Sequence, residues 1–296
     1  MSEEQASMLE NRAGAPVWAL DPEVIYLNHG SFGACPRPVL EAQARLRDMM
    51  EREPITFLER EIQGRLDGAR DRVARLVGAD PGNLVFVPNA THGVNTVLRS
   101  LDLSPGDEIV VTDHEYPACR NAAEFAASRA GARVVPARVP FPIAAAEDAI
   151  APVIEAIGER TRLVLVDHVT SPTGLVLPLE RLVEEVQERR GIDLLVDGAH
   201  ALGMLPLDLR ALGAAYYTAN GHKWLCTPKG SAILHVREDR LDRVRPLSIS
   251  HGAGVEPGRG RSRFHAEFDW TGTFDPTGIL AMPEARSVAM ASSTSS

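Results

Sequence analysis

The sequence predicts an α/β fold in which a mainly parallel, seven-stranded type of sheet lies between helices. Short apolar runs alternate along the chain with amphipathic stretches of helical length. The apolar runs are nearly continuous rather than interrupted by polar residues, which is typical of strands buried on both faces. Successive parallel strands need a crossover connection, and the amphipathic stretches can supply helices for it.

Six apolar runs mark the expected strands. They are Leu84–Val87, Glu108–Thr112, Arg133–Val139, Leu163–Asp167, Leu194–Asp197 and Ala232–Val236, and a further apolar run, Ala214–Tyr217, precedes the last of them. Helices are expected between them at Gly93–Leu101, Ala118–Arg129, Ala145–Ile157 and Leu179–Arg190. Two helices precede the sheet. One opens at Pro36-Arg37-Pro38, where proline suits an early helical position, and the other covers Ile55–Leu76 before the C-cap Gly78.

The pattern changes after Pro246. His251–Arg263 is rich in glycine and arginine and predicts a loop, and a short apolar piece follows at Gly278–Met282. Ser287–Ser296 is small and polar without periodicity, which predicts a disordered tail. The expected organisation is an N-terminal arm (1–20), a large domain (21–245), a loop with the start of a connection to a small domain (246–286) and the tail (287–296).

Composition and charge exclude several classes of function. The chain has 296 residues, of which 44% are hydrophobic, enough for a sizeable core. Its net charge of −9 comes without a long basic run, so nucleic acid is not an expected partner. No stretch approaches the ~20 apolar residues that span a bilayer, and the start of the chain does not resemble a signal peptide.

The cysteines point to a reducing environment. Cys35, Cys119 and Cys226 are odd in number and far apart. This spacing fits neither a disulfide framework nor a metal knuckle, so no metal site is expected. The cytoplasm is therefore the expected location.

Polar groups follow three of the apolar runs, where ligands bind in open α/β sheets. The first is Asn89–Gly93 (NATHG), which opens a helix. A helix N-terminus offers N–H groups and a partial positive charge, which suits a phosphate, and Thr91 could add a hydroxyl donor. A simple N-cap by Asn89 or Thr91 is the alternative interpretation.

The second group is Asp197–His200 (DGAH), which ends an apolar run. A carboxylate at the end of a buried strand needs a partner, because an unpaired buried charge is costly. A protonated pyridine nitrogen is one such partner, and Asp197 would keep that ring protonated. Capping of a helix or bonding to nearby backbone is the alternative role of this aspartate.

The third group is Asn220–Trp224 (NGHKW), after the run Ala214–Tyr217. Lysine is usually an exposed, strongly hydrated charge, so a surface loop lysine is the alternative here. Among apolar groups, however, the pKa of Lys223 would fall and its amine would become a nucleophile for carbonyls. Together the three groups offer a phosphate cradle, a pyridinium partner and an imine-forming amine.

These groups resemble the motifs of pyridoxal 5′-phosphate (PLP) enzymes of fold type I, class V aminotransferase family, and most of all its isopenicillin N epimerase-like subgroup. The resemblance rests, in the family's order, on Tyr26–Gly33 (YLNHGSFG), Asn89–Thr91, Asp197–His200, Gly221–Trp224 and Trp270–Thr273. It extends from about Asp21 to Pro283. It implies an aspartate aminotransferase-like large domain that binds PLP.

The resemblance also implies roles for individual residues. Lys223 would hold PLP as a Schiff base and move the Cα proton, Asp197 would pair with the pyridine nitrogen, and His200 would lie near O3′ or the imine. The other implied cofactor-binding residues are Ala90, Thr91, His92, Tyr116, Asn220, His222, Gly272 and Thr273. Of these, Thr91, Asn220 and His222 would contact the phosphate.

Tyr116 resembles the aromatic residue that stacks on the cofactor ring, although a buried tyrosine at a strand end is the alternative. Gly272 and Thr273 resemble a segment that reaches the phosphate of a partner subunit, so the resemblance implies a homodimer with shared sites. Asn28, His29 and Gly30 are expected near the substrate.

The sequence departs from the family in places. His92 stands where the subgroup often has an acidic residue or threonine, and Phe274 stands where it often has arginine. Family members usually continue for about another 100 residues as a small C-terminal domain, which is expected to be largely missing here. That domain usually carries the arginine that binds the substrate carboxylate, so this task has no assigned residue.

The favoured function is that of a PLP-dependent enzyme acting on an amino acid or a derivative, of the epimerase or class V aminotransferase type. Its reaction would depend on where the Cα proton returns or which substituent leaves. One alternative is a PLP-dependent C–S lyase or a cysteine desulfurase-like enzyme. Another is a truncated, catalytically impaired paralogue that binds PLP. A nucleotide-binding protein is disfavoured, because the first strand is followed by neither G-x-G-x-x-G nor a P-loop.

Overall fold

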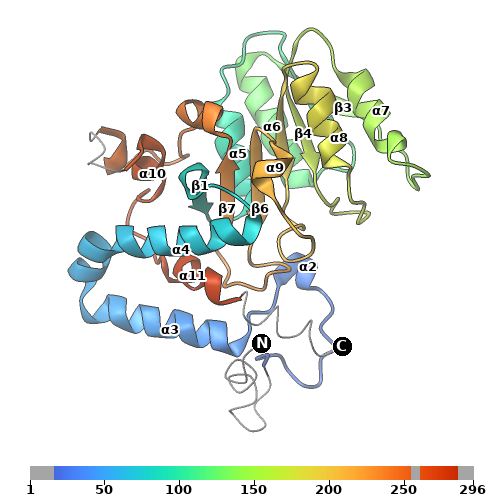
Figure 1. The fold of residues 1–296 in the computed structure, drawn as a ribbon. Coiled ribbons are helices and arrows are strands. Elements are labelled where there is room, and N and C mark those ends of the chain that lie inside the picture. Colours follow the sequence, from blue (N-terminus) through green and yellow to red (C-terminus); the bar gives the residue numbers. More distant parts are fainter. Residues whose placement is uncertain (1–16, 255–260, 286–296) are drawn as a thin grey trace.

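The computed structural model describes residues 17–254 and 261–285 and contains a seven-stranded sheet between helices (Figure 1). The strand order is β1-β7-β6-β5-β4-β2-β3. The neighbours from β6 to β3 run parallel, whereas β7 is antiparallel to both β1 and β6. The mainly parallel α/β fold predicted from the sequence is therefore confirmed.

The strands lie close to the expected apolar runs. They are β1 (Leu84–Val87), β2 (Glu108–Thr112), β3 (Arg133–Ala137), β4 (Thr161–Asp167), β5 (Asp193–Asp197), β6 (Tyr216–Asn220) and β7 (Ala232–Val236). The largest difference is in β6, which begins two residues after Ala214 and continues through Asn220. Asn220 therefore ends a strand rather than opening a loop.

The helices follow the expected order, with two interruptions. They are α2 (His29–Phe32), α3 (Arg37–Arg52), α4 (Ile62–Val77), α5 (Ala90–Ser100), α6 (Pro117–Ala130), α7 (Glu147–Ala156), α8 (Leu179–Leu182), α9 (Leu209–Leu212), α10 (Arg263–Phe268) and α11 (Thr277–Leu280). A π-helical turn, Thr56–Glu61, precedes α4, and another, Val183–Glu188, continues α8. Gly78 ends α4 in the left-handed conformation, as a C-cap glycine should.

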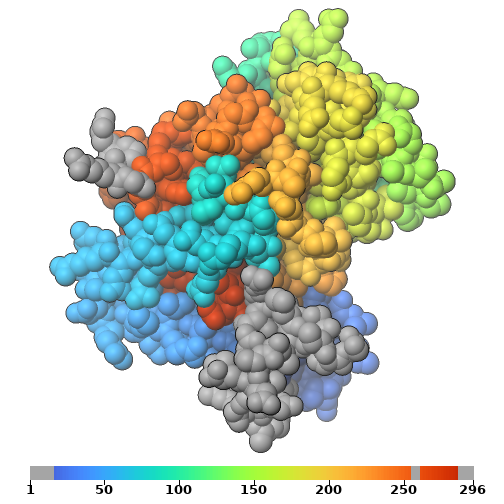
Figure 2. All heavy atoms as spheres, in the orientation of Figure 1, coloured from blue at the N-terminus to red at the C-terminus, as the bar shows by residue number. Residues whose placement is uncertain are grey.

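Alternate strand residues enter different cores, because successive side chains of a strand point to opposite faces. Leu194 and Val196 of β5 belong to one core and Leu195 to the other. Helices α4, α7, α8 and α11 cover the first face, and α5, α6 and α10 cover the second. Figure 1 shows α4 on the near side of the molecule, close to β1 and β7. In Figure 2 the same helix forms part of the blue and cyan surface.

Two short helices that were not predicted follow the loop expected at His251–Arg263. Within that range a 3-10 turn covers His251–Gly254, residues 255–260 lie outside the described ranges, and α10 begins at the last residue, Arg263. Phe264 and Phe268 of α10 are buried in one core, and Ile279 and Leu280 of α11 in the other. The chain beyond the predicted loop therefore completes both cores.

The division of the chain into domains stays a prediction. Its arm (1–20) is described only from residue 17, and its tail (287–296) lies outside the described residues. No helix in the part of the chain that the structure describes is long and apolar enough to cross a membrane.

Candidate active site

The carboxyl ends of the central strands bring the predicted groups to one edge of the sheet. Asp197 ends β5, and Lys223 follows β6, which pairs with β5 in parallel. Side chains at this edge converge because parallel strands all end there. The three predicted groups therefore belong to one site.

Asp197 is held at the floor of the site. It is 1% exposed, its Oδ1 accepts the Ala199 N–H at 2.9 Å, and its Oδ2 accepts the Cys119 thiol at 3.1 Å. Burial raises its pKa, and these two hydrogen bonds and the charge of Lys223 partly offset that rise. Both hydrogen-bond donors are neutral, so the carboxylate lacks a directly bonded cation in the described structure.

Lys223 is half-buried, and its amine lies 3.0 Å from His200 Nε2. Burial lowers the pKa of Lys223, although the acidic residues around it, Asp197 first, oppose the change. A lysine whose pKa is lowered in this way carries more of the uncharged, nucleophilic amine at neutral pH.

The hydrogen bond between Trp224 and His200 determines which atom donates in the contact between His200 and Lys223. Trp224 Nε1 lies 3.3 Å from His200 Nδ1 and can only donate, so Nδ1 must accept. Burial is the main cause that lowers the pKa of His200 to about 4, so the ring is neutral and, with Nδ1 accepting, carries its proton on Nε2. Nε2–H then donates to Lys223 Nζ, which can accept only as an uncharged amine. The Trp224–His200 pair thus selects the reactive form of Lys223.

The N-terminal turn of α5 lies at the same edge. Asn89 Oδ1 caps the helix by accepting the His92 N–H at 2.8 Å, and Asn220 Oδ1 accepts the Ala90 N–H at 2.8 Å. A Cβ at Gly93 would lie 2.2 Å from Thr218 Oγ1, so glycine lets α5 approach β6 closely. Asn89 therefore makes the predicted cap, and Asn220 uses its oxygen to position the helix.

The histidines beside this turn are uncharged. Burial lowers the pKa of His92, and burial together with the charge of Lys223 lowers that of His222. A neutral imidazole has one N–H to donate. His222 Nδ1 is buried and finds no hydrogen-bond partner among the described residues.

Tyr116 lies on the open side of Lys223. Its ring centroid is 5.9 Å from Lys223 Nζ, and its side chain is 41% exposed. Tyr116 is the N-cap residue of α6. An exposed aromatic face beside the amine could pack on a flat ring bonded to it.

The opening segment lies directly against the lysine loop. The Gly33 N–H donates to His222 O at 2.9 Å, and a Cβ at Gly33 would lie 2.1 Å from Lys223 O. Gly30 is similarly close to the Trp224 ring, where a Cβ would lie 2.8 Å from Cζ2. His29 Nδ1 accepts the Ala34 N–H at 3.3 Å, and Asn28 precedes α2 as its N-cap residue. The predicted substrate residues Asn28, His29 and Gly30 therefore border the lysine loop.

Gly272 and Thr273 stand apart from the other predicted residues. No hydrogen bond or ion pair joins them to Lys223, Asp197 or Asn220 within the described ranges. Gly272 has a φ of 131° and open space around its Cα, and Thr273 is exposed. Their expected role in a partner subunit's site stays a prediction.

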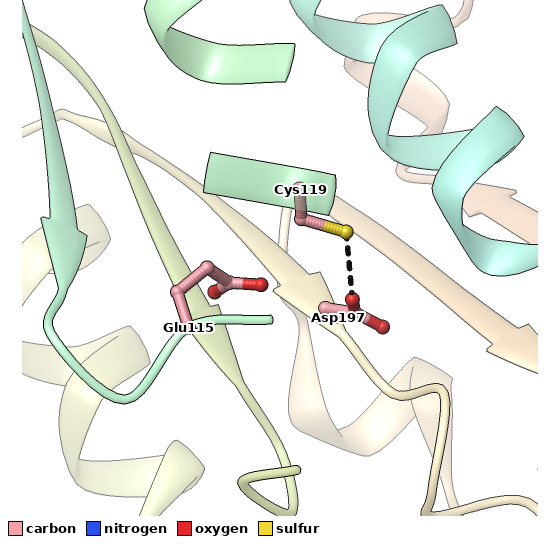
Figure 3. Close-up of side chains that lie close together, drawn as sticks. All are labelled: Glu115, Cys119 and Asp197. Carbon is pink, nitrogen blue, oxygen red and sulfur yellow. Dashed lines mark hydrogen bonds between the residues drawn. The ribbon is translucent and has the colours of Figure 1, made fainter. Parts of the chain in front are cut away.

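Buried acidic residues that the sequence interpretation missed lie beneath Lys223. One carboxyl oxygen of Glu115, one of Asp197 and the Sγ of Cys119 all lie within 4.8 Å of one another (Figure 3). Asp167 ends β4 opposite Asp197 in the pairing of β4 with β5. The position of Asp167 at the end of an apolar run was a signal that could have found it, because a buried carboxyl there needs a partner, whereas no such signal marks Glu115.

The site fits PLP. Asp197 lacks a directly bonded cation and could pair with a protonated ring nitrogen, and Lys223 presents an uncharged amine for an aldehyde. The N-terminal turn of α5 can receive a phosphate at the same edge. The fold and the site together define a PLP-type enzyme built on an α/β sheet.

The chain belongs to the class V aminotransferase family. The model of that family, "Aminotransferase class-V", matches residues 34–284. The family is PLP-dependent, so PLP is the cofactor, and the predictions of family, fold class and PLP-dependent enzyme are confirmed.

Known relatives fall into epimerases and carbon–sulfur lyases. Isopenicillin N epimerase of Amycolatopsis lactamdurans is 40% identical over 278 residues, covering 90% of this chain and 69% of the relative. A putative L-cysteine desulfhydrase of Oryza sativa subsp. japonica is 35% identical over 279 residues, covering 88% of this chain and 56% of the relative. The structure of the cystine C–S lyase C-DES with cysteine persulfide has a TM-score of 0.80 at 29% identity, covering 91% of this chain and 73% of C-DES.

Proposed function

We propose that this chain moves the Cα proton of an amino acid or an amino-acid derivative, with epimerisation as the favoured outcome. The half-buried amine of Lys223, held 3.0 Å from His200 Nε2 with its pKa lowered by burial, is the observation that carries the proposal. The similarity to isopenicillin N epimerase, at 40% identity, supports epimerisation as the outcome.

The residues that would hold PLP surround this amine. Lys223 would bond its aldehyde carbon, Asp197 would pair with its ring nitrogen, and the first turn of α5 with Thr91 would bind its phosphate. Tyr116 offers an aromatic face 5.9 Å from the amine for the ring. Bound PLP supplies an electron sink that makes the Cα–H bond of a linked amino acid acidic.

Lys223 is the base in this proposal. Once the amino group of the substrate takes its place, its amine is free and uncharged and can accept the Cα proton. His200 Nε2–H holds the amine through their 3.0 Å hydrogen bond, while Trp224 keeps the proton on Nε2. Lys223 keeps the proton that it removes, and delivery of a solvent-derived proton to the opposite face of Cα inverts the substrate.

A deuterium-exchange experiment tests this function. The PLP-loaded chain is incubated in D₂O with single amino acids and amino-acid-derived peptides, NMR follows loss of the Cα proton, and chiral chromatography follows inversion. We expect exchange with inversion for at least one substrate, and none in Lys223→Ala. Equal exchange in the variant, or none in the PLP-loaded wild type with the whole panel, would count against the proposal.

A C–S lyase is the second candidate, supported by the desulfhydrase and C-DES relatives. Such a reaction needs the same base but no protein thiol to take the sulfur. Cys35 and Cys119 are buried, and Cys226 is half-buried with Sγ 3.6 Å from His29 Nδ1. This burial favours a lyase over a cysteine desulfurase. Release of pyruvate, ammonia and sulfide from cysteine, or of pyruvate, ammonia and cysteine persulfide from cystine, without inversion, would make the lyase the better assignment.

We also propose a cytoplasmic homodimer. The side chains of Ile25 and Leu27, beside the site, are 88% and 83% exposed, and a partner subunit would cover such apolar surface. The described cysteines are free, which suits a reducing compartment. Sedimentation analysis of the PLP-loaded chain measures the oligomeric state, and an active monomer would contradict the shared site.

A further inference from the structure

Glu115 is a buried residue whose carboxyl group has no role in the proposed reaction. Glu115 lies between β2 and α6, is 5% exposed, and neither of its carboxyl oxygens has a hydrogen-bond partner among the described residues. Figure 3 shows this carboxyl group directed toward Cys119 and Asp197 rather than toward solvent. A buried carboxylate without a partner is costly, so this arrangement requires an explanation.

The surroundings of Glu115 contain more acidic groups than positive charges. Asp197 and Asp167 approach it from β5 and β4, and Cys119 approaches it from α6. Lys223, which follows β6, is the basic residue that acts on Asp167 and Asp197, and its hydrogen bond with His200 requires an uncharged amine. Tyr217 of β6, buried and uncharged, also faces Asp197. Three carboxylates cannot all stay ionised at this depth without cations, so protons must occupy all but one of them.

Hydrogen bonds decide which carboxyl stays ionised. Asp197 accepts from both the Ala199 N–H and the Cys119 thiol, and such bonds favour the charged form. Neither carboxyl oxygen of Glu115 has a partner of hydrogen-bond geometry among the described residues, the nearby Tyr116 backbone N–H only partly offsets the rise in its pKa, and Asp167 Oδ2 also lacks a partner. Burial and the neighbouring charges of Asp167 and Asp197 raise the pKa of Glu115 well above its usual range.

We propose that Glu115 is held as a neutral carboxylic acid beside Asp197 and acts as a positioning residue for the cofactor's ring nitrogen. Its proton keeps Asp197 as the single ionised carboxylate opposite that nitrogen, and its O–H is a donor close to Asp197 and Cys119. The effect on the ring rests on the proposed binding of PLP. The neutral state of Glu115 rests on the protein alone.

The first test is an infrared spectrum of the chain without PLP at neutral pH. We expect the carbonyl band of a protonated glutamic acid, shifted by ¹³C-labelled glutamate and missing from Glu115→Gln, separate from any band of Asp167 that ¹³C-labelled aspartate shifts. The labelled wild type tests the assignment even where the variant fails to fold. Absence of a glutamate acid band would overturn the inference.

The second test uses the affinity for PLP. Glu115→Gln imitates the neutral acid, so its Kd for PLP should stay within about threefold of the wild type. Asp197→Asn removes the ionised partner and should weaken binding by about 100-fold. An equal loss in both variants would show that Glu115 is ionised and would overturn the inference.

Two further outcomes separate the possible failures. The first is Cd²⁺ binding to the PLP-free chain, measured as a thiolate-to-metal absorbance band that Glu115→Gln abolishes. Such binding would show that the Glu115 oxygens hold a cation, and it would overturn the inference that Glu115 is a neutral acid. If the wild type shows the glutamate acid band but takes up no PLP, the proposed function fails and Glu115 remains a neutral acid.

Discussion

Lys223 owes its reactivity to the side chains around it rather than to its own chemistry. Burial lowers its pKa, and the hydrogen bonds from Trp224 to His200 and from His200 to Lys223 require an uncharged amine. The first of these effects could be expected from the apolar sequence around the lysine. The second could not, because it depends on three side chains meeting in space.

Replacing Trp224 by phenylalanine tests this chain of hydrogen bonds. Without the indole N–H, His200 Nδ1 can carry the proton and Nε2 can accept from a lysine ammonium. We expect the pKa of Lys223 to rise, so that less of the amine is uncharged and reaction with PLP at neutral pH slows about tenfold. The rate of formation of the PLP absorbance band, measured across pH, gives this pKa, and ¹⁵N NMR of His200 reports the tautomer. An unchanged rate profile with an unchanged tautomer would contradict the assignment.

At the scale of elements, close approach places the opening segment on the lysine loop. Gly33 and Gly93 both occupy positions where a Cβ would collide with a neighbouring element. Sequence periodicity predicted most helices and strands but not these contacts. It also missed the helical character of α10 and α11, whose few residues are too short for a clear period and are fixed by tertiary packing instead.

Gly33→Ala tests the contact between these segments. The new Cβ would meet Lys223 O at 2.1 Å and His222 O at 2.4 Å, both backbone atoms that cannot rotate away. We expect the segment to separate from the loop and the Kd for PLP to rise at least about tenfold. Gly64→Ala is the control, because no atom lies within 4 Å of that Cβ position in α4. It should leave the Kd unchanged and stabilise the helix by about 0.5–1 kcal/mol. Equal PLP affinity in both variants would refute the contact.

At the scale of the whole molecule, buried neutral histidines link stability to pH. Burial lowers the pKa values of His168, His200 and His235 from 6.5 to about 4. A depressed folded-state pKa gives stability that is complete above the unfolded value and is lost as pH falls. The free energy of unfolding should therefore decrease from pH 6.5 toward about 4.

His235→Leu isolates one of these contributions. His235 is 4% exposed on β7, and its shift from 6.5 to about 4 corresponds to about 3 kcal/mol. We expect the wild type to lose about 3 kcal/mol more than the variant between those pH values. Urea unfolding at several pH values measures both curves. Parallel curves would mean that His235 does not contribute to the acid sensitivity.

The fold and the principal site residues could be predicted at this scale because strand ends share one edge of the sheet. Asp197 and Lys223 are far apart in sequence yet meet through the parallel pairing of β5 with β6. Glu115 and Asp167 escaped prediction because their importance comes from an excess of buried carboxyl groups. That excess is visible only once the strands and α6 are assembled.

Covalent labelling of Lys223 tests the central claim most directly. The chain is incubated with PLP, reduced with borohydride and mapped by peptide mass spectrometry, with Lys223→Ala as the control. The account predicts a yellow absorbance band before reduction, a single pyridoxyl group on Lys223 afterwards, and neither in the variant. Label on Lys229, the other lysine of the chain, instead of on Lys223 would contradict it.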